Sequence, residues 1–247
     1  MNHKRVIVAV AMLAALGLAP VAQAQPSIMD YRWSFDVGLG WDNSLSGNIN
    51  SGASGKLNDQ VVVVVPNSYS DVYGTGFHLR FGGGYLIDEI SEVRAVFTYQ
   101  SLSADLTAMG DFGVSTLYGQ YDPYKSFGLD VGFRRYFDVS PKVRPYLEGT
   151  FGIGFITEID VVLSAPSANF TGRATDFYDR TAAFSLAGNA GVLWQVSNHV
   201  GAYGQFGLRW MSGLSQIDDL AGTGLETIND DSSRWTLPIM VGMRVRF

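Results

Sequence analysis

The sequence predicts an all-β fold, namely an eight-stranded antiparallel up-and-down transmembrane β-barrel with short periplasmic turns and four long extracellular loops. Three observations predict it: a secretory signal at the start, apolar residues at every second position in eight later segments, and connections that alternate between short and long. The composition agrees, because the 247 residues are 47% apolar, 13% aromatic and only 16% charged.

The composition also excludes several classes of protein. The chain has no cysteine, which excludes a disulfide scaffold and a thiolate metal site. Frequent aromatic residues and sparse charge exclude a disordered chain. The net charge of −6 is opposite to what a phosphate-binding surface needs, so we expect no nucleic-acid partner.

The first 24 residues have the pattern of a secretory signal peptide. Two basic residues precede the uncharged stretch 6–18, and a small-x-small cleavage site ends at Ala24. A transmembrane helix is the alternative, but the stretch is shorter than the about 20 residues that a span needs, and Pro20 follows it. We therefore expect residues 1–24 to be removed after Ala24 and residues 25–247 to form one barrel domain.

Eight segments alternate between apolar and other residues, which is the period of a strand with one face in an apolar medium. The last segment shows this best, because every odd position from Trp235 to Phe247 is apolar. The segments in chain order are 31–41, 73–85, 93–99, 127–133, 147–155, 184–194, 200–210 and 235–247.

The connections between these segments alternate in length. Short ones lie near 87–92, 138–142 and 197–199, and long ones cover about 43–72, 103–123, 157–180 and 212–233. Bacterial outer-membrane barrels have this alternation together with an even number of strands. The run 61–65 is not counted as a ninth strand, since an odd number would put the C-terminus on the wrong side; we expect it to extend above the membrane.

Tryptophan and arginine positions indicate which face of the strands meets lipid. A soluble lipocalin-like barrel also has eight strands, but its apolar face points inward. Here all five tryptophans lie on the apolar face near strand ends, as in an aromatic girdle. Trp33 and Trp194 lie towards the short turns, and Trp41, Trp210 and Trp235 lie towards the long loops. Arginines lie on the opposite face, and each would cost about 2 to 4 kcal/mol if it faced the middle of the bilayer.

The inward face is predicted to hold a network of paired charges that closes the lumen. Eight strands enclose an interior that side chains can fill, and buried charges are costly unless they are paired. The predicted members are Asp36, Arg80, Arg94, Asp130, Arg134, Glu148, Arg209 and Arg244. Because arginines outnumber acids, some must bond to carbonyl groups, tyrosines or water. A narrow or gated polar path is the alternative, since inward glycines leave some free volume.

The features that carry a family resemblance are the signal, the eight amphipathic strands, the closing residues 244–247 (Arg-Val-Arg-Phe) and the segment 144–149 (Arg-Pro-Tyr-Leu-Glu-Gly). In these features the chain resembles the small bacterial outer-membrane β-barrel proteins. That group includes the membrane domain of OmpA and shorter OmpX-like and OmpW-like barrels. The resemblance implies that the barrel-assembly machinery reads a C-terminal signal; the alternative is that Phe247 only completes the aromatic girdle. The implied signal residues are Val241, Met243, Val245 and Phe247. The chain ends with the barrel, so cell-wall anchoring is not expected.

We expect no enzymatic activity and no cofactor. After export only His78 and His199 remain as candidate bases, and the residues after His78 do not match the His-x-Ser of the lipid A deacylase family. A lipid-modifying enzyme is therefore a remote alternative. No spacing supports a metal site. Acidic residues gather in the last loop and could bind calcium, but a solvated loop is the preferred interpretation; they are Asp218, Asp219, Glu226, Asp230 and Asp231.

The function expected from the sequence is a structural and surface-interaction role in the outer membrane. Its partners would be outer-membrane lipid and lipopolysaccharide, the barrel-assembly machinery during insertion, and an unidentified extracellular ligand of the loops. The loops carry apolar residues that we expect to be exposed, at 61–65, 118, 121, 161–163, 170 and 177. The alternative is a small porin or an OmpW-like transport barrel for ions or small apolar molecules.

Overall fold

The structure is a computed structural model that describes residues 31–215, 222–229 and 232–247. The predicted signal peptide, with its cleavage site after Ala24, lies outside the described residues. The same holds for four acids of the last loop, Asp218, Asp219, Asp230 and Asp231. Within the described part of the chain, no helix is long and apolar enough to cross a membrane.

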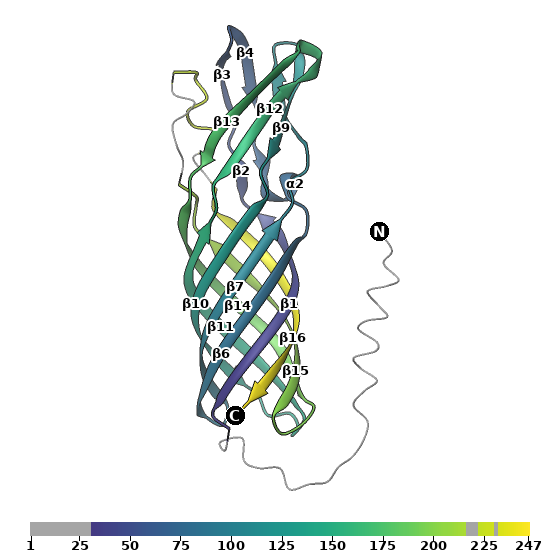
Figure 1. Cartoon of the computed structure of the whole chain (residues 1–247), viewed down its shortest axis with the longest axis vertical. Coiled ribbons are helices and arrows are strands. Elements are labelled where there is room, and N and C mark those ends of the chain that lie inside the picture. Colours follow the sequence, from purple (N-terminus) through teal and green to yellow (C-terminus); the bar gives the residue numbers. More distant parts are fainter. Residues whose placement is uncertain (1–30, 216–221, 230–231) are drawn as a thin grey trace, which may run out of the picture.

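Eight antiparallel strands close into a barrel, which confirms the predicted fold class (Figure 1). The strands are β1 (Trp33–Ser46), β6 (Gly76–Asp88), β7 (Ser91–Leu102), β10 (Tyr124–Tyr136), β11 (Val143–Ile156), β14 (Thr181–Gln195), β15 (Val200–Met211) and β16 (Arg234–Arg246). Around the barrel their order is β1-β16-β15-β14-β11-β10-β7-β6. The first and last strands pair in register, with Leu39 opposite Val241, and so close the ring.

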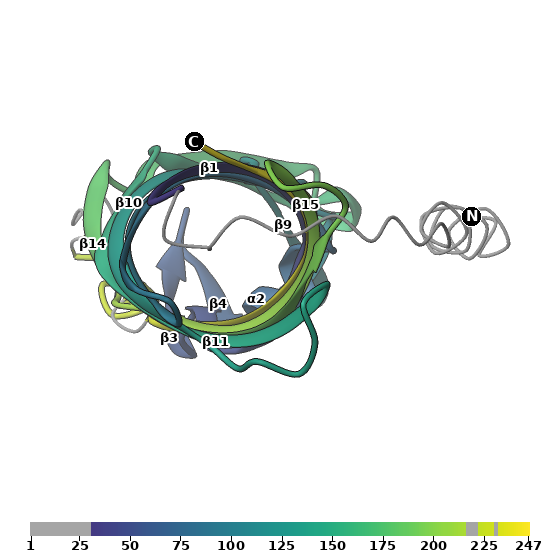
Figure 2. The same ribbon diagram turned by 90° about the horizontal axis from the view of Figure 1, so that it is seen from below.

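The barrel has the polarity that the sequence predicts. On β1, Phe35 and Leu39 are 48% and 51% exposed on the outside, whereas Asp36 between them is 1% exposed. The same alternation runs through the other barrel strands, with arginines and carboxylates inside and large apolar side chains outside. Figure 2, seen from below, shows the closed ring of strands. A surface of this kind is stable in hydrocarbon and unstable in water.

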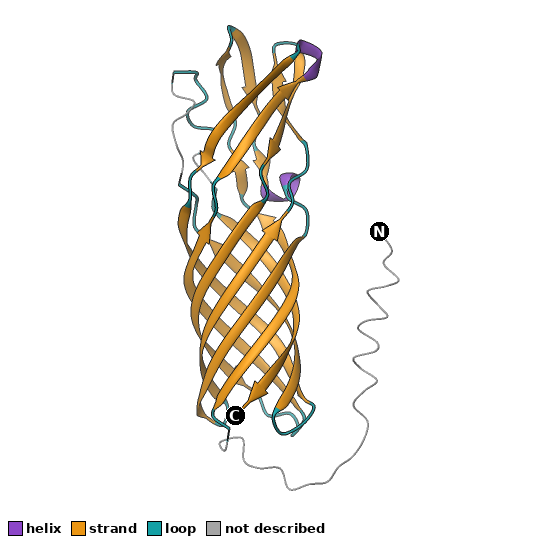
Figure 3. Ribbon diagram, in the orientation of Figure 1, coloured by secondary structure: helices purple, strands orange, loops and turns teal. Residues whose placement is uncertain are grey.

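The two ends of the barrel differ in their connections (Figure 3). We call the end with the three short turns the turn end; these turns join β6 to β7, β10 to β11, and β14 to β15. The first described strand begins there, and the last strand ends there. We call the opposite end, from which the four long connections extend, the loop end.

The first three long connections form a second sheet beyond the barrel instead of separate loops. Its six strands are β3 (Ala53–Leu57), β4 (Gln60–Val64), β8 (Thr107–Phe112), β9 (Ser115–Tyr121), β12 (Ile159–Ala165) and β13 (Phe170–Tyr178), in the order β13-β12-β9-β8-β4-β3. We call it the loop-end sheet. The shorter elements are β2 (Asn48–Asn50), β5 (Asn67–Ser68), α2 (Tyr69–Val72) and η2 (Pro166–Ala168). The run 61–65 contributes β4 and lies outside the barrel, as predicted.

The prediction that the apolar loop residues are exposed was wrong for most of them. Residues 62, 64, 121, 161, 163 and 177 are each at most 6% exposed and belong to a shared hydrophobic core with Ile49, Leu225 and Ile228. This core draws on all four long connections, so no single loop shows it. Only Val61, Val63 and Val65 keep large exposed fractions, of 56%, 39% and 45%.

A change of face explains part of this error. In β11 the odd positions point outward, and Phe155 is 48% exposed. The odd positions of β12 keep the same sequence period, but Ile159 and Val161 are 0% and 1% exposed. Residues 157 and 158 interrupt the strand between them. The interruption turns the same apolar pattern from the outer surface of the barrel to the core of the loop-end sheet.

A matched pair of substitutions on β4 tests this core. Val62→Asp buries a carboxylate without a partner, and the cost of several kcal/mol should open the sheet. Because about 1.4 kcal/mol changes an equilibrium tenfold, we expect limited proteolysis of the loop-end sheet to become at least about tenfold faster. Val63→Asp places the same group on the exposed face and should leave the cleavage rate unchanged. Equal cleavage of the two variants would contradict the core.

Candidate functional site: the charged lumen

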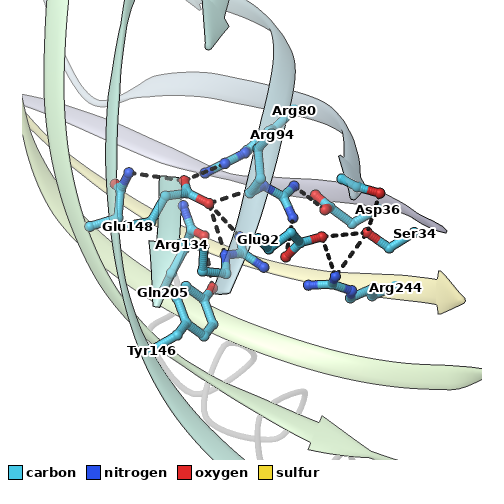
Figure 4. Close-up of polar contacts among 12 residues, drawn as sticks. Ser34, Asp36, Arg80, Glu92, Arg94, Arg134, Tyr146, Glu148, Gln205 and Arg244 are labelled. Carbon is cyan, nitrogen blue, oxygen red and sulfur yellow. Dashed lines mark hydrogen bonds and ion pairs between the residues drawn. The ribbon is translucent and has the colours of Figure 1, made fainter. Parts of the chain in front are cut away.

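The polar side chains of the barrel interior form two layers. The turn-side cluster, drawn in Figure 4, consists of Asp36, Arg80, Glu92, Arg94, Arg134, Glu148 and Arg244. The loop-side cluster consists of Asp42, His78, Gln100, Asp130, Arg209 and Arg234. Six of the eight network residues predicted from the sequence lie in the first cluster. The other two, Asp130 and Arg209, lie in the second.

Glu148 on β11 is the centre of the turn-side cluster. Its Oε1 accepts a hydrogen bond from Arg80 Nη2 at 2.5 Å. Its Oε2 accepts one from Arg134 Nε at 2.9 Å and lies 3.1 Å from Arg94 Nε. Three arginines from β6, β7 and β10 thus converge on one buried carboxylate. Charge-assisted bonds of this kind offset the cost of removing both charges from water.

Glu92 is a second buried carboxylate. It was not among the predicted network residues, because the sequence pattern predicted a turn at 87–92. The structure begins β7 at Ser91, so Glu92 points into the lumen. Its Oε1 accepts from Ser34 Oγ at 2.6 Å, and its Oε2 accepts from the Tyr136 hydroxyl at 2.7 Å. Extending the even-numbered pattern of Arg94 back by one step would have found it.

The surplus arginines use tyrosine side chains, as the excess of arginine over acid requires. Arg244 donates to Glu92 and to the Tyr136 hydroxyl. The guanidinium of Arg134 lies 4.0 Å from the ring centre of Tyr146, and that of Arg144 lies 4.6 Å from the ring centre of Tyr136. Cation–π contacts in a desolvated interior are worth about 2 kcal/mol or more.

The space beside the inward glycines is occupied by charged side chains and is not an open path. A Cβ atom on Gly82 would overlap the Arg94 guanidinium and the Asp36 carboxylate, which form an ion pair there. A Cβ on Gly84 would overlap the Glu92 carboxylate. The free volume that the sequence assigned to these glycines is therefore filled by the network, so they offer no support for a permanently open pore.

The loop-side cluster is held by fewer ion pairs. Asp130 accepts from Ser185 Oγ at 2.6 Å and lies 3.4 Å from Arg209 Nη2. Arg234 Nη2 donates to Gln100 Oε1 at 2.5 Å, and Gln100 in turn donates to Asp42. Arg234, Asp42 and Gln100 were absent from the predicted network, because the sequence placed the first two at the limits of strands.

Tyrosines cover the lumen at the loop end. The Arg234 guanidinium lies 3.9 Å from the ring centre of Tyr124 and 5.3 Å from that of Tyr69 on α2. Tyr73, which the sequence assigned to a barrel strand, lies before β6 and packs against both rings. Burial raises the pKa of Tyr69 and of Tyr73, so both phenols stay neutral. These rings form an apolar cover over the charged interior.

Neither histidine has the surroundings of a catalytic base. His78 is buried, its ring nitrogens have no hydrogen-bond partner, and its Nδ1 lies 3.8 Å from Asp42 Oδ2. His199 lies at the turn end, where Nδ1 is 3.3 Å from the Arg246 carbonyl and Tyr31 packs edge-on. Among the described residues, no group of three or more His, Asp or Glu side chains is arranged to hold a metal ion.

The residues of the predicted girdle and of the predicted assembly signal lie on the outer surface. Trp33, Trp41 and Trp235 are exposed on the outside, and Trp194 and Trp210 are half-buried. The residues of the predicted assembly signal, Val241, Met243, Val245 and Phe247, also face outward. Phe247 and Trp33 exchange two backbone hydrogen bonds, of 3.0 and 3.1 Å, at the seam of the barrel.

Comparison with known proteins finds similar folds among solved structures. Neisserial surface protein A is 13% identical, covering 87% of this chain and 97% of that one with a TM-score of 0.45. Ail, the attachment invasion locus protein of Yersinia pestis, is 14% identical (87% and 99% covered, TM-score 0.39). The outer-membrane protein OprG from Pseudomonas aeruginosa is 12% identical (88% and 97%, TM-score 0.41). No family model and no curated protein sequence matches the chain.

Removing the central carboxylate tests the turn-side cluster. Glu148→Gln keeps the shape of the side chain but leaves three buried guanidinium groups without their shared counter-charge, which should cost about 3–5 kcal/mol. Glu158→Gln is the matched control, because Glu158 pairs with Arg180 on the exposed surface, and it should cost less than about 1 kcal/mol. Urea unfolding in lipid vesicles measures both. Equal stability of the two variants would contradict the assigned role of Glu148.

Proposed function

We propose that this protein is a bacterial outer-membrane β-barrel with a structural and surface-interaction role. In this proposal the barrel anchors the chain in the membrane and holds the loop-end sheet outside the cell. The observation that carries it is the combination of an apolar outer barrel surface with an ion-paired interior. Such a barrel is stable only where hydrocarbon surrounds it.

The arrangement of the two ends supports an orientation. Outer-membrane barrels have their short turns in the periplasm and their long connections outside, so the turn end would face the periplasm. The tryptophans near both ends of the strands are suited to the two lipid interfaces, where lipid and lipopolysaccharide would be the partners. The exposed positions from Val241 to Phe247 are accessible to an assembly factor before the last strand pairs, which supports their proposed role in insertion.

The paired lumen supports a closed barrel over the transport alternative. Glu148 and Glu92 connect β1, β6, β7, β10, β11 and β16 in the turn-side half. The tyrosines around Arg234 cover the other end. Ions would have to displace these pairs to pass. The surroundings of His78 and His199 support a protein without enzymatic activity, because His78 makes no hydrogen bond and Nδ1 of His199 faces a backbone carbonyl.

The loop-end sheet supports a role in surface interaction. A shared core fixes its six strands, so its outer face is a defined surface and not a set of independent loops. Exposed valines of β4 lie on that face together with Lys56 and Asp111. Exposed apolar residues with few charges are typical of surfaces that bind another molecule. A ligand of unidentified chemistry would bind to this face of the loop-end sheet.

Recordings from planar bilayers distinguish the closed barrel from a transport barrel. We expect the folded protein to give no steady conductance in potassium chloride beyond that of the protein-free bilayer, because paired side chains fill its lumen. A steady conductance that Glu148→Gln or Arg134→Gln abolishes would contradict the closed barrel and favour the transport alternative. Heat-modifiable migration on a gel verifies that each sample is folded before it is recorded.

Attachment of whole cells tests the surface role. Cells that make the protein should attach to cultured epithelial cells more strongly than cells without it. Val62→Asp should remove most of the gain, since it opens the loop-end sheet while the barrel stays inserted. Immunoblots of isolated outer membranes, with an antibody against a tag placed directly after the signal peptide, verify that both kinds of cell contain equal amounts of the protein. Equal attachment with and without the protein would refute adhesion to this target.

A further inference from the structure

A small cavity lies in the lumen between the two charged clusters. It has a volume of about 20 Å³, and its lining comes from seven of the eight barrel strands. His78, Arg80, Thr98, Asp130, Gln205 and Arg209 are among the lining residues. A cavity needs about 10–15 Å³ to hold one water molecule. This one therefore has room for a single water, or for one ion that is slightly larger.

Three of the lining residues carry buried nitrogen atoms without hydrogen-bond partners. Both ring nitrogens of His78, Nε of Arg80 and Nε of Arg209 are buried without a hydrogen-bond partner. A histidine ring carries at least one N–H group, and each arginine Nε carries one. The lining carboxylate, Asp130, already accepts from Ser185 and Arg209. An occupant that accepts hydrogen bonds would give these donors a partner.

The charges of the lumen favour an anion in particular. In the turn-side cluster four arginines face three carboxylates, and in the loop-side cluster Arg209 and Arg234 match Asp42 and Asp130. Arg246 at the turn end adds one more buried positive charge. Arginine keeps its proton in proteins, so the excess cannot disappear by deprotonation. A buried charge without a counter-charge is costly, and a bound anion removes that cost.

We propose that this cavity binds one small monovalent inorganic anion of the halide class, between Arg80, Arg209 and His78. The size of the cavity excludes phosphate and organic anions. The bound halide supplies the counter-charge that the turn-side arginines lack, and it stabilises the closed lumen without contributing to transport. A single water molecule is the competing occupant, and it would leave the excess charge of the lumen uncompensated.

Chloride-35 NMR of the folded protein in detergent micelles tests the site. Exchange with a buried site broadens the chloride line, and added bromide should reverse this broadening. Gln205→Glu places a carboxylate on the cavity while it keeps an acceptor for the Tyr146 hydroxyl, which bonds Gln205 at 2.9 Å. It should weaken halide binding by more than about tenfold, because like charges repel strongly where the dielectric constant is low.

The matched control is Gln120→Glu, the same substitution on an exposed position of β9. It should broaden the chloride line as much as the unmodified protein does. If Gln205→Glu broadens the chloride line as much as the unmodified protein does, the broadening comes from surface arginines, and the proposal is overturned.

Crystals grown in bromide provide a test that needs no variant, and so they decide the matter even if Gln205→Glu does not refold. We expect an anomalous bromide peak within the cavity, within hydrogen-bond distance of Arg80 or Arg209. A water molecule in the cavity, with bromide confined to the surface, would overturn the proposal.

Discussion

Side chains of a strand alternate between two faces, and in this barrel one face meets hydrocarbon while the other lines the lumen. The rest of the structure follows from this constraint. No water can satisfy backbone groups in the bilayer, so each strand must pair on both edges and the sheet must close. Closure with eight strands leaves an interior that only side chains can fill. The face that does not meet lipid therefore has to carry polar groups that satisfy one another, and here these are arginines and carboxylates.

Size complementarity makes this dense packing of charge feasible. Long side chains such as Arg94 extend across the lumen, and the glycines opposite them provide the space, as at Gly82 and Gly84. Glu92 and Glu148 each accept from several strands, so one residue can fix the positions of three or more strands. Glu148, for instance, joins β11 to β6, β7 and β10. The network thereby sets the register of the barrel as well as its closure.

The sequence contains the periodic part of this design but not its partners. Parity alone places Asp36, Arg80 and Glu148 inside, because facing depends only on local alternation. It fails at Glu92 and Arg234, since whether a strand has begun depends on pairing with a distant neighbour. The core of the loop-end sheet was missed for the same reason. Val62 and Leu163 are buried by contacts between different connections, which no single segment reveals.

The charged lumen and the loop-end sheet form one continuous body, and Arg234 joins them. Its guanidinium donates to Gln100 in the barrel and lies over the ring of Tyr124, while Tyr69 on α2 packs beside it. The Tyr69 hydroxyl bonds the Ser232 carbonyl in the last connection at 2.9 Å. Both rings also belong to the core that holds the loop-end sheet. Because interlocking contacts of this kind couple the two parts, the outer face of the sheet is held in a fixed orientation above the barrel, as the proposed role in surface interaction requires.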